Sequence, residues 1–325
     1  MSTPFGVAEA EAGGLGLSVG GAGGEIAARS PMALFWRRFR QDRIALASLA
    51  FIVLIVVIAL AAPLVVKLFG LPSPYSQNPN LLNAFGEPTG PSAAHPLGVD
   101  NLGRDIASRI VYGTRVSLEV GVIGTAISAV IGVVVGLLAG YYRGWVDTVL
   151  SRITDLVLCF PTLLFGIGLA SACAVNGCLG GTITPGVPVI IAVVVIFGWT
   201  YIARIVRGLV LSLREKEFVE AARSLGASNS RIMFREILPN LAAPVIVYAS
   251  LLIPVNILFE AALSFFGVGV QQPTASWGEM ISEGTQIFSV AWWYVVFPGG
   301  ALLLTVLAFN LLGDGLQDAL NPKGD

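Results

Sequence analysis

Few side chains in this sequence of 325 residues could carry out metal or phosphate chemistry. The chain has a single histidine, His95, and its three cysteines, Cys159, Cys173 and Cys178, lack the paired Cys-x-x-Cys spacing of a metal site. Zinc and haem sites built from clustered histidines need more ligands than this. The three lysines follow Val, Glu and Pro, so the Gly-Lys-Ser/Thr element of a nucleotide-binding phosphate loop is missing. We therefore expect no catalytic residue, no metal and no cofactor in this chain.

One carboxyl group, that of Glu260, falls within a long apolar run. Ionisable groups inside a membrane are costly, and they face the interior of a helix bundle or water. Glu260 can therefore be a pathway residue that carries a proton, or a hydrogen-bonded packing residue between helices. The sequence leaves both interpretations open.

Membrane-spanning helices must position these side chains. Hydrophobic residues make up 55% of the chain and charged residues 12%, with a mean hydropathy of +0.80, whereas a soluble domain is about 25% charged. A helix needs about 20 apolar residues to cross the hydrocarbon core. Six apolar runs meet that requirement, at about 44–66, 116–140, 153–175, 187–210, 241–267 and 294–312. The sequence predicts an all-α membrane protein with six transmembrane helices.

The basic residues predict the orientation of these spans. If the N-terminus lies on the inner side of the membrane, the only basic residues on the outer side are Lys67, Arg104, Arg109 and Arg115. Because inner segments are enriched in Lys and Arg, both termini are expected in the cytoplasm. The net charge of −1 gives no reason to expect nucleic acid as a partner.

Four regions are expected along the chain. Residues 1–30 are rich in Gly and Ala and predict a flexible cytoplasmic tail. Residues 31–115 hold the first span and a long outer loop, and residues 116–312 hold a five-helix core with a cytoplasmic loop at 211–240. Residues 313–325 form a cytoplasmic C-terminal tail.

The cytoplasmic loop begins with an amphipathic pattern over residues 215–225. Phe218, Ala221, Ala222 and Leu225 share a predicted apolar face. The small side chains of Ala221 and Ala222 would let a partner surface approach the backbone closely.

The second part of this loop predicts a turn and another helix. Gly226 is suited to cap the first helix, and Ser228 to begin a second short helix that stops before Pro239. The expected result is a helix–turn–helix elbow that stands out of the membrane.

These residues carry a family resemblance. The pattern consists of Glu220, Ala221 and Ala222, then Gly226, then Ile237, Leu238, Pro239 and Asn240. It resembles the EAA loop of ABC-importer permeases, whose elbow is the coupling helix that docks in a groove of a cytoplasmic ATPase subunit. The resemblance implies the type I permease fold, without catalysis by this chain, and ATP hydrolysis by separate subunits.

The outer loop resembles one subfamily of those permeases. Its motif runs from His95 through Gly98, Asp100, Gly103, Arg104, Asp105, Ser108 and Arg109 to Leu118. Together with residues 260–267 and 313–322, it is similar to the C-type permease of the dipeptide, oligopeptide and nickel subfamily. Within the motif, Asp100, Arg104, Asp105 and Arg109 can line the pore mouth below a docked binding protein, or form an ion-paired loop that covers it. His95 is expected to pack in the loop and not to bind metal.

The resemblance implies one permease subunit of an ATP-driven peptide importer in a bacterial or archaeal cytoplasmic membrane. Its implied partners are a second permease, two ATPase subunits, an extracytoplasmic solute-binding protein and membrane lipid. Nickel import within the same subfamily is an alternative, and so is a proton-coupled secondary transporter that uses Glu260 and Asp155. Pairing between Cys173 and Cys178 stays open.

Overall fold

The computed structural model describes residues 31–320, and the predicted tail at 1–30 lies outside them. Within the described part the regular elements are helices, with three isolated β-bridges in the loops. The helices are α1 (Pro31–Gln41), α2 (Arg43–Leu60), α3 (Ala62–Leu68), η1 (Pro79–Leu81), α4 (Ile106–Tyr142), α5 (Gly144–Leu158), α6 (Thr162–Ala172), α7 (Val187–Leu213), α8 (Glu217–Ser224), α9 (Asn229–Arg231), the π-helical turn η2 (Ile232–Ile237), α10 (Leu238–Phe265), α11 (Trp277–Gln286) and α12 (Trp293–Leu320).

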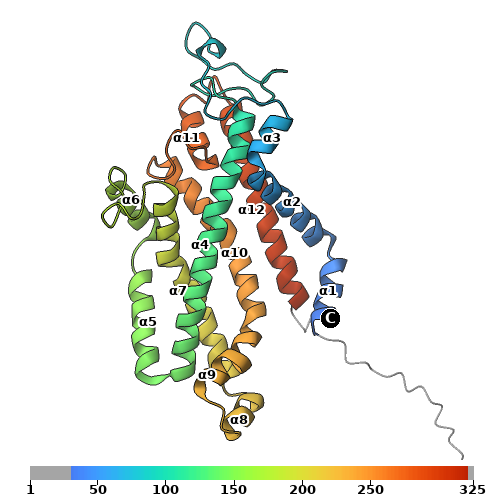
Figure 1. The fold of residues 1–325 in the computed structure, drawn as a ribbon, viewed down its shortest axis with the longest axis vertical. Coiled ribbons are helices and arrows are strands. Elements are labelled where there is room, and N and C mark those ends of the chain that lie inside the picture. Colours follow the sequence, from blue (N-terminus) through green and yellow to red (C-terminus); the bar gives the residue numbers. More distant parts are fainter. Residues whose placement is uncertain (1–30, 321–325) are drawn as a thin grey trace, which may run out of the picture.

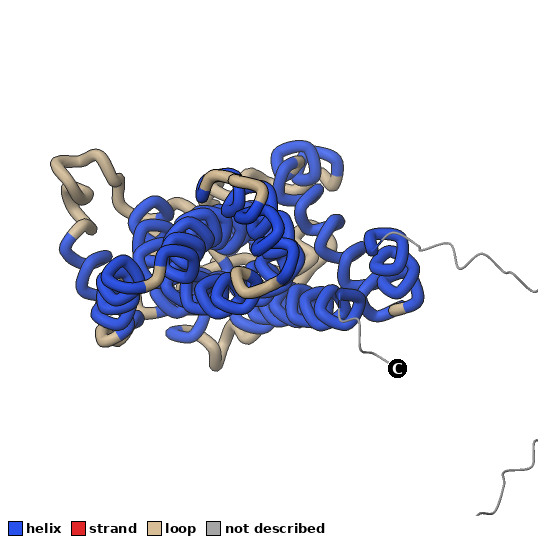
Figure 2. Tube along the Cα trace, turned by 90° about the horizontal axis from the view of Figure 1, so that it is seen from below, coloured by secondary structure: helices blue, strands red, loops and turns tan. Residues whose placement is uncertain are grey.

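The long helices run side by side as one bundle (Figures 1 and 2). Five helical segments are long and apolar enough to cross a membrane: α2, α4, α7, α12 and the segment from α9 to α10. The bent pair α5 and α6 passes the same test as a sixth. The prediction of an all-α protein with six apolar runs is therefore confirmed, with differences in where the spans begin, bend and end.

The third predicted span is broken and not straight. Helices α5 and α6 meet at an angle of 76°. The break falls at Cys159–Pro161, and Pro161 immediately precedes α6. Proline has no amide hydrogen to continue the α5 ladder, so the chain turns there. Helix α5 also begins at Gly144, nine residues before the predicted span.

Two other predicted boundaries were wrong. The first run divides at Ala61 into α2 and α3, because Pro63 takes an early position of α3, where its missing amide hydrogen costs no helical bond. The last run was expected to end at residue 312, but α12 continues to Leu320 and packs its final turns against Phe39 and Ala45. Pro254 lies inside α10 without ending it.

The centre of the bundle is the contact between α4 and α7. Gly132, Gly136 and Gly140 recur on one face of α4, and a Cβ atom on Gly136 would lie 2.6 Å from the carbonyl oxygen of Ala203. At Gly140 it would lie 2.7 Å from the Cβ atom of Val210. The glycine spacing therefore lets the two backbones approach closely.

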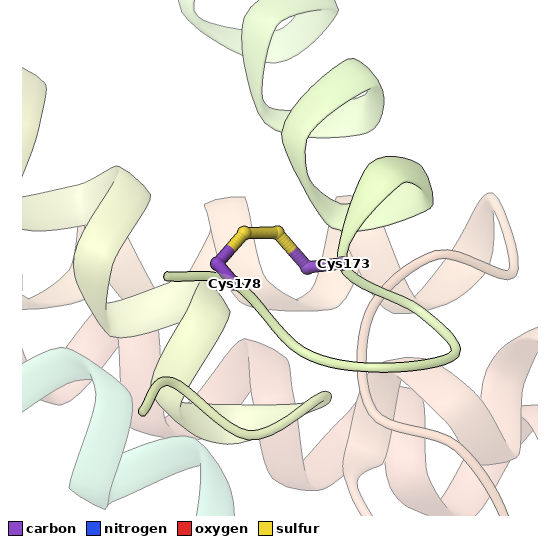
Figure 3. The surroundings of a disulfide bond; sticks show 2 residues. All are labelled: Cys173 and Cys178. Atoms are coloured by element: carbon purple, nitrogen blue, oxygen red, sulfur yellow. A yellow bond between two sulfur atoms is a disulfide. The ribbon is translucent and has the colours of Figure 1, made fainter. Parts of the chain in front are cut away.

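The connection between α6 and α7 is closed by a disulfide bond between Cys173 and Cys178 (Figure 3). Their Cα atoms lie 5.0 Å apart, and Cys173 is fully buried against Ala170 and Val189. The structure thus pairs the two cysteines whose state the sequence left open. Cys159 is free and exposed.

Candidate functional site

Two groups of residues lie at opposite ends of the bundle. The elbow, residues 217–240, forms one end, where α8 and α9 project beyond the other helices (Figure 1). The outer loop, residues 69–105, forms the other end beside α3 and α11.

The elbow has a defined turn. Gly226 adopts a φ of +78°, which favours glycine, and nothing lies within 4 Å of the position a Cβ atom would take. The amide of Ala227 donates to the carbonyl of Ala222, and the amide of Gly226 donates to that of Arg223, both at 3.0 Å. This bond pair is the Schellman arrangement that ends a helix. Ser228 then caps α9 by accepting a bond from the amide of Arg231. The caps predicted at Gly226 and Ser228 are in place.

The elbow is anchored to the bundle through a buried residue. Val219 of α8 has no exposed surface and packs with Ile232, Met233 and Ile237. Burying such a side chain stabilises the elbow by about 1.5–3 kcal/mol. The elbow therefore moves with α7 and α10, to which these residues connect it.

Polar bonds add a second anchor, at the end of α4. The guanidinium of Arg214 donates to the carbonyl of Tyr141 at 2.6 Å. The Tyr141 hydroxyl in turn donates to the side-chain oxygen of Asn229 at 2.8 Å. Helix α4 is thus tied to both sides of the elbow.

The apolar face of α8 differs from the prediction. Val219 faces inward, while Phe218 is 40% exposed and Leu225 is 89% exposed. Ala221 is exposed as well, and Ala222 is half-buried. Because the helix is short and touches the bundle on one side only, the four residues expected to share one apolar face divide between its bundle side and its exposed side. The exposed members, Phe218, Ala221 and Leu225, form what we term the elbow crown.

The second helix of the elbow was expected to stop before Pro239, but it continues through that residue. The π-helical turn η2 leads directly into α10 at Leu238, and Pro239 follows as the second residue of α10. The side chain of Asn240 donates to the carbonyl of Glu236 at 2.6 Å. Ile237 is fully buried and Pro239 is exposed.

The outer motif forms a tight buried turn. One carboxylate oxygen of Asp100 accepts bonds from the amides of Leu102 and Arg104, each at 2.9 Å. The other lies 2.5 Å from Nε of Arg104. Gly98 and Gly103 have φ values of +81° and +71°, and a Cβ atom on Gly103 would collide with the carbonyl of Asn78. The motif glycines therefore fold the loop back on itself.

Asp105 begins α4. Its carboxylate accepts a bond from the amide of Ser108 at 2.8 Å, and its second oxygen lies 2.9 Å from Nδ1 of His95. His95 thus packs in the loop against a helix cap. Among the described residues no group of three or more His, Cys, Asp or Glu side chains is arranged to hold a metal ion.

The motif arginines reach carboxylates that the sequence analysis missed. Arg109 donates to Glu279 at 2.8 Å, and Arg104 lies 3.1 Å from Glu283. The hydroxyl of Tyr294 also donates to Glu283. The sequence did carry one signal for these carboxylate partners. The outer segment that contains α11 has acidic residues and no Lys or Arg.

Burial dominates the electrostatics of this network. The side chains of Arg109 and Asp100 have no exposed surface, and that of Glu279 is 7% exposed. Burial raises the pKa of Glu279 to about 8, against the opposing effect of Arg109. Oε1 of Glu279 has no hydrogen-bond partner. Asp100, Arg104 and Arg109 form, with Glu279 and Glu283, a buried ion-paired network that joins the outer loop to α4 and α11.

Glu260 lies in the last turns of α10 and has no exposed surface. Both carboxylate oxygens accept hydrogen bonds, one from Ser117 of α4 at 2.9 Å and one from Ser264 of α10 at 2.8 Å. The residue links two helices, which is the geometry of the packing interpretation.

Comparison with known proteins decides the family. A family model described as the binding-protein-dependent transport system inner membrane component matches residues 132–324. Another, the N-terminal TM domain of oligopeptide transport permease C, matches residues 30–88. The chain belongs to the binding-protein-dependent ABC transport permeases.

Relatives align along most of this permease. It is 42% identical over 295 residues to the glutathione transport system permease protein GsiD of Pectobacterium atrosepticum, covering 91% of this chain and 92% of that protein. It is 41% identical over 300 residues to the dipeptide transport system permease protein DppC of Alkalihalophilus pseudofirmus, covering 92% of each. The predicted dipeptide, oligopeptide and nickel subfamily is thereby confirmed.

The fold agrees with that assignment. A chain of the MetNI methionine ABC transporter, in an inward-facing crystal form, superposes with a TM-score of 0.54 and 19% identity over 66% of this chain and 98% of the other. The permease therefore has the type I ABC-importer fold. It is a multi-pass transport subunit and not an enzyme, and ATP hydrolysis in such systems belongs to separate subunits.

Proposed function

We propose that this permease forms half of the pathway through which an ABC importer takes up short peptides. The named cargoes of its relatives, a dipeptide and the tripeptide glutathione, support a peptide cargo over nickel. The other half of the pathway comes from a second, similar permease.

The partners follow from the two ends of the bundle. Two cytoplasmic ATPase subunits act on the assembly, one of them at the elbow of this chain. A solute-binding protein delivers cargo at the outer loop, and both chain termini lie in the cytoplasm. The distribution of Lys and Arg supports this orientation.

The elbow crown is the observation that carries the proposal. Phe218, Ala221 and Leu225 are exposed on a helix beyond the end of the bundle. Exposed apolar groups at a projecting point are typical of a surface that a partner covers. Their helix is fixed to the bundle by Val219, so force applied to the crown reaches the membrane helices.

The elbow acts as a mechanical joint. ATPase closure displaces α8, and the bonds among Arg214, Tyr141 and Asn229 carry that displacement to α4. The continuous path from η2 into α10 carries it to a second membrane helix. Two helices then tilt together and switch the pathway between its inner and outer openings.

The test uses two glycines with the same backbone strain. Gly226→Val and Gly180→Val each place a side chain at a positive φ, +78° and +68°, in open space. The strain costs about 1–2 kcal/mol at either position. Gly226→Val should lower ATP-driven peptide uptake by the reconstituted complex strongly, while membrane insertion and uptake by the matched Gly180→Val variant stay normal.

Normal uptake by Gly226→Val would contradict the coupling role. A proton-coupled carrier predicts a different result, namely uptake driven by a proton gradient without ATPase subunits. Uptake of that kind by the purified permease would replace the proposal.

A further inference from the structure

Two ion pairs lie between α5 and α7 in the cytoplasmic half of the bundle. Arg207 donates to both carboxylate oxygens of Asp147, at 2.5 and 2.7 Å. Arg204 donates to Asp155 at 2.6 Å. These four charges belong neither to the elbow nor to the outer motif, and the sequence analysis did not pair them.

The pairs lie at membrane depth. Helix α7 ends at Leu213, so Arg207 and Arg204 lie about 9 and 14 Å from its cytoplasmic end at 1.5 Å per residue. Its 27 residues span about 40 Å, which exceeds a hydrocarbon core of about 30 Å by roughly 5 Å at each end. Both arginines therefore originate within the core.

The Asp155–Arg204 pair is nevertheless open. The side chain of Asp155 is 50% exposed and that of Arg204 is 55% exposed. An arginine can extend its long side chain toward the membrane surface, but an aspartate is too short to do so. Charges at this depth face water or a protein interior and not lipid. The exposed side of this pair must therefore meet water or polar groups.

A cavity lies beside the pairs. It has a volume of about 370 Å³ and is walled by α4, α5 and α7, with Ser151, Thr154, Asp155, Arg204 and Arg207 among its lining residues. Small-molecule sites commonly have volumes of about 300–1,000 Å³. Small residues of α4, Gly136 and Ala139, form its floor.

We propose that the Asp155–Arg204 and Asp147–Arg207 pairs line the inner half of the translocation pathway and form a polar station for the charged ends of a peptide zwitterion. The inference rests on the proposed peptide import, because it names where that cargo touches this chain. The exposed Arg204 attracts the carboxylate end and the exposed Asp155 attracts the ammonium end. One positive charge per negative charge leaves no net charge, so the station passes a zwitterion without holding it tightly.

The first test asks whether the cavity contains water and needs no cargo. Ser151→Cys and Ile153→Cys are placed singly in a Cys159→Ser background that retains the Cys173–Cys178 bond. Ser151 lines the cavity, whereas Ile153 lies two residues along α5, off the cavity wall and 47% exposed.

The assembled complex is treated with a charged, membrane-impermeant thiol reagent from the cytoplasmic side. A thiol in water ionises and reacts, whereas one in lipid does not, so we expect the Ser151 position to react roughly ten times faster than the Ile153 position. Equal rates at the two positions, or no reaction at Ser151 in any nucleotide state, would overturn the assignment.

The second test asks whether the charges touch cargo. Arg204→Glu should raise uptake of a lysine-containing peptide relative to a glutamate-containing one by at least about fivefold. Fivefold corresponds to the 1 kcal/mol between unit charges about 4 Å apart in water, and a charge reversal acts on both peptides. If Arg204→Glu prevents assembly, Arg204→Gln is measured in its place. It should shift the ratio in the same direction but by less. Arg152→Glu, on the neighbouring helix α5 and off the cavity wall, is the control for a charge reversal and should leave the ratio unchanged.

An equal loss of both peptides in the Arg204 variants would show a purely structural role and overturn the station. Failure of the parent complex to take up any peptide would instead overturn the proposed function. The thiol measurement is independent of that failure, so the two outcomes are distinguishable.

Discussion

Glu279 gives the sharpest prediction about the buried ion-paired network of the outer loop. Its carboxyl group is buried, accepts one bond from Arg109 at 2.8 Å and leaves its other oxygen without a partner. Arg104, Asp100, Glu283 and Tyr294 complete the surrounding network. Burial raises its pKa from the ordinary 4.5 to about 8, so the folded protein holds a proton here at neutral pH.

The sign of the pH dependence follows from this pKa. Between pH 4.5 and about 8 the unfolded chain binds fewer protons at this site than the folded protein, so the free energy of unfolding falls as the pH rises. The full difference corresponds to about 5 kcal/mol, and roughly 3 kcal/mol of it lies between pH 5.5 and 8. For a chain of this size that is a fall of at least about 5 °C in the unfolding midpoint.

Glu279→Gln keeps the shape of the protonated side chain and removes the titration. The unfolding midpoint of the purified complex is measured in detergent from pH 5.5 to 8.5. The variant should match the parent within about 1 kcal/mol at pH 5.5, because both are then neutral, and exceed it at pH 8.5. Glu87→Gln, a surface carboxyl bonded to Asn83, is the control and should follow the parent.

Two results would refute this reasoning. One is a parent whose midpoint does not change across the range. The other is a Glu279→Gln variant whose midpoint falls with pH as steeply as that of the parent.

Three further predictions concern the rest of the chain. Glu260→Gln should retain most ATP-driven uptake, because the amide can still bond to the two serines. Glu260→Ala should lose about 2–5 kcal/mol of stability, because it leaves a void and removes the partner of both serine hydroxyls. Loss of uptake in the Gln variant at normal expression would favour proton coupling. Single cysteines at Ser92 and Ser289 should react with an impermeant reagent in intact cells and one at Ser230 should not, whereas labelling at Ser230 alone would invert the topology. Alkylation without reduction should modify Cys159 only, as read by mass spectrometry, and breaking the disulfide should cost about 2 kcal/mol because the closed loop is short. Alkylation of any second cysteine before reduction would contradict the bond.

The spans could be predicted because hydrocarbon imposes a length and a polarity on each helix. Residues 187–210 differ from α7 only at the C-terminal end of the helix. The break at Pro161 was also predictable, because proline lacks an amide hydrogen. Its 76° angle was not, since it depends on how α5 and α6 each pack against α7.

The elbow was predictable where local chemistry decides. Gly226 and Ser228 cap their helices through bonds within a few residues. The face of α8 was not predictable, because the bundle selects Val219, and periodicity alone favoured Phe218 and its neighbours. Continuation through Pro239 depends on the π-helical turn, for which the sequence offers no simple signal.

The ion pairs were beyond sequence reasoning. Arg109 and Glu279 are 170 residues apart, and Arg207 and Asp147 are 60 apart. Composition indicates that charges in a membrane protein need partners, but the partner depends on which helices pack together. That information exists only in the folded bundle.

The central claim is that the elbow crown binds an ATPase subunit. The direct measurement places a photoreactive amino acid at Leu225, 89% exposed in the elbow crown, and at Leu179, 79% exposed in the loop between α6 and α7, as its matched control. After irradiation of the assembled, transport-competent complex, mass spectrometry identifies the cross-linked partner. We expect an ATPase adduct from Leu225 and none from Leu179. A transport-competent complex that yields no ATPase adduct at Leu225, or yields one at Leu179, would contradict it.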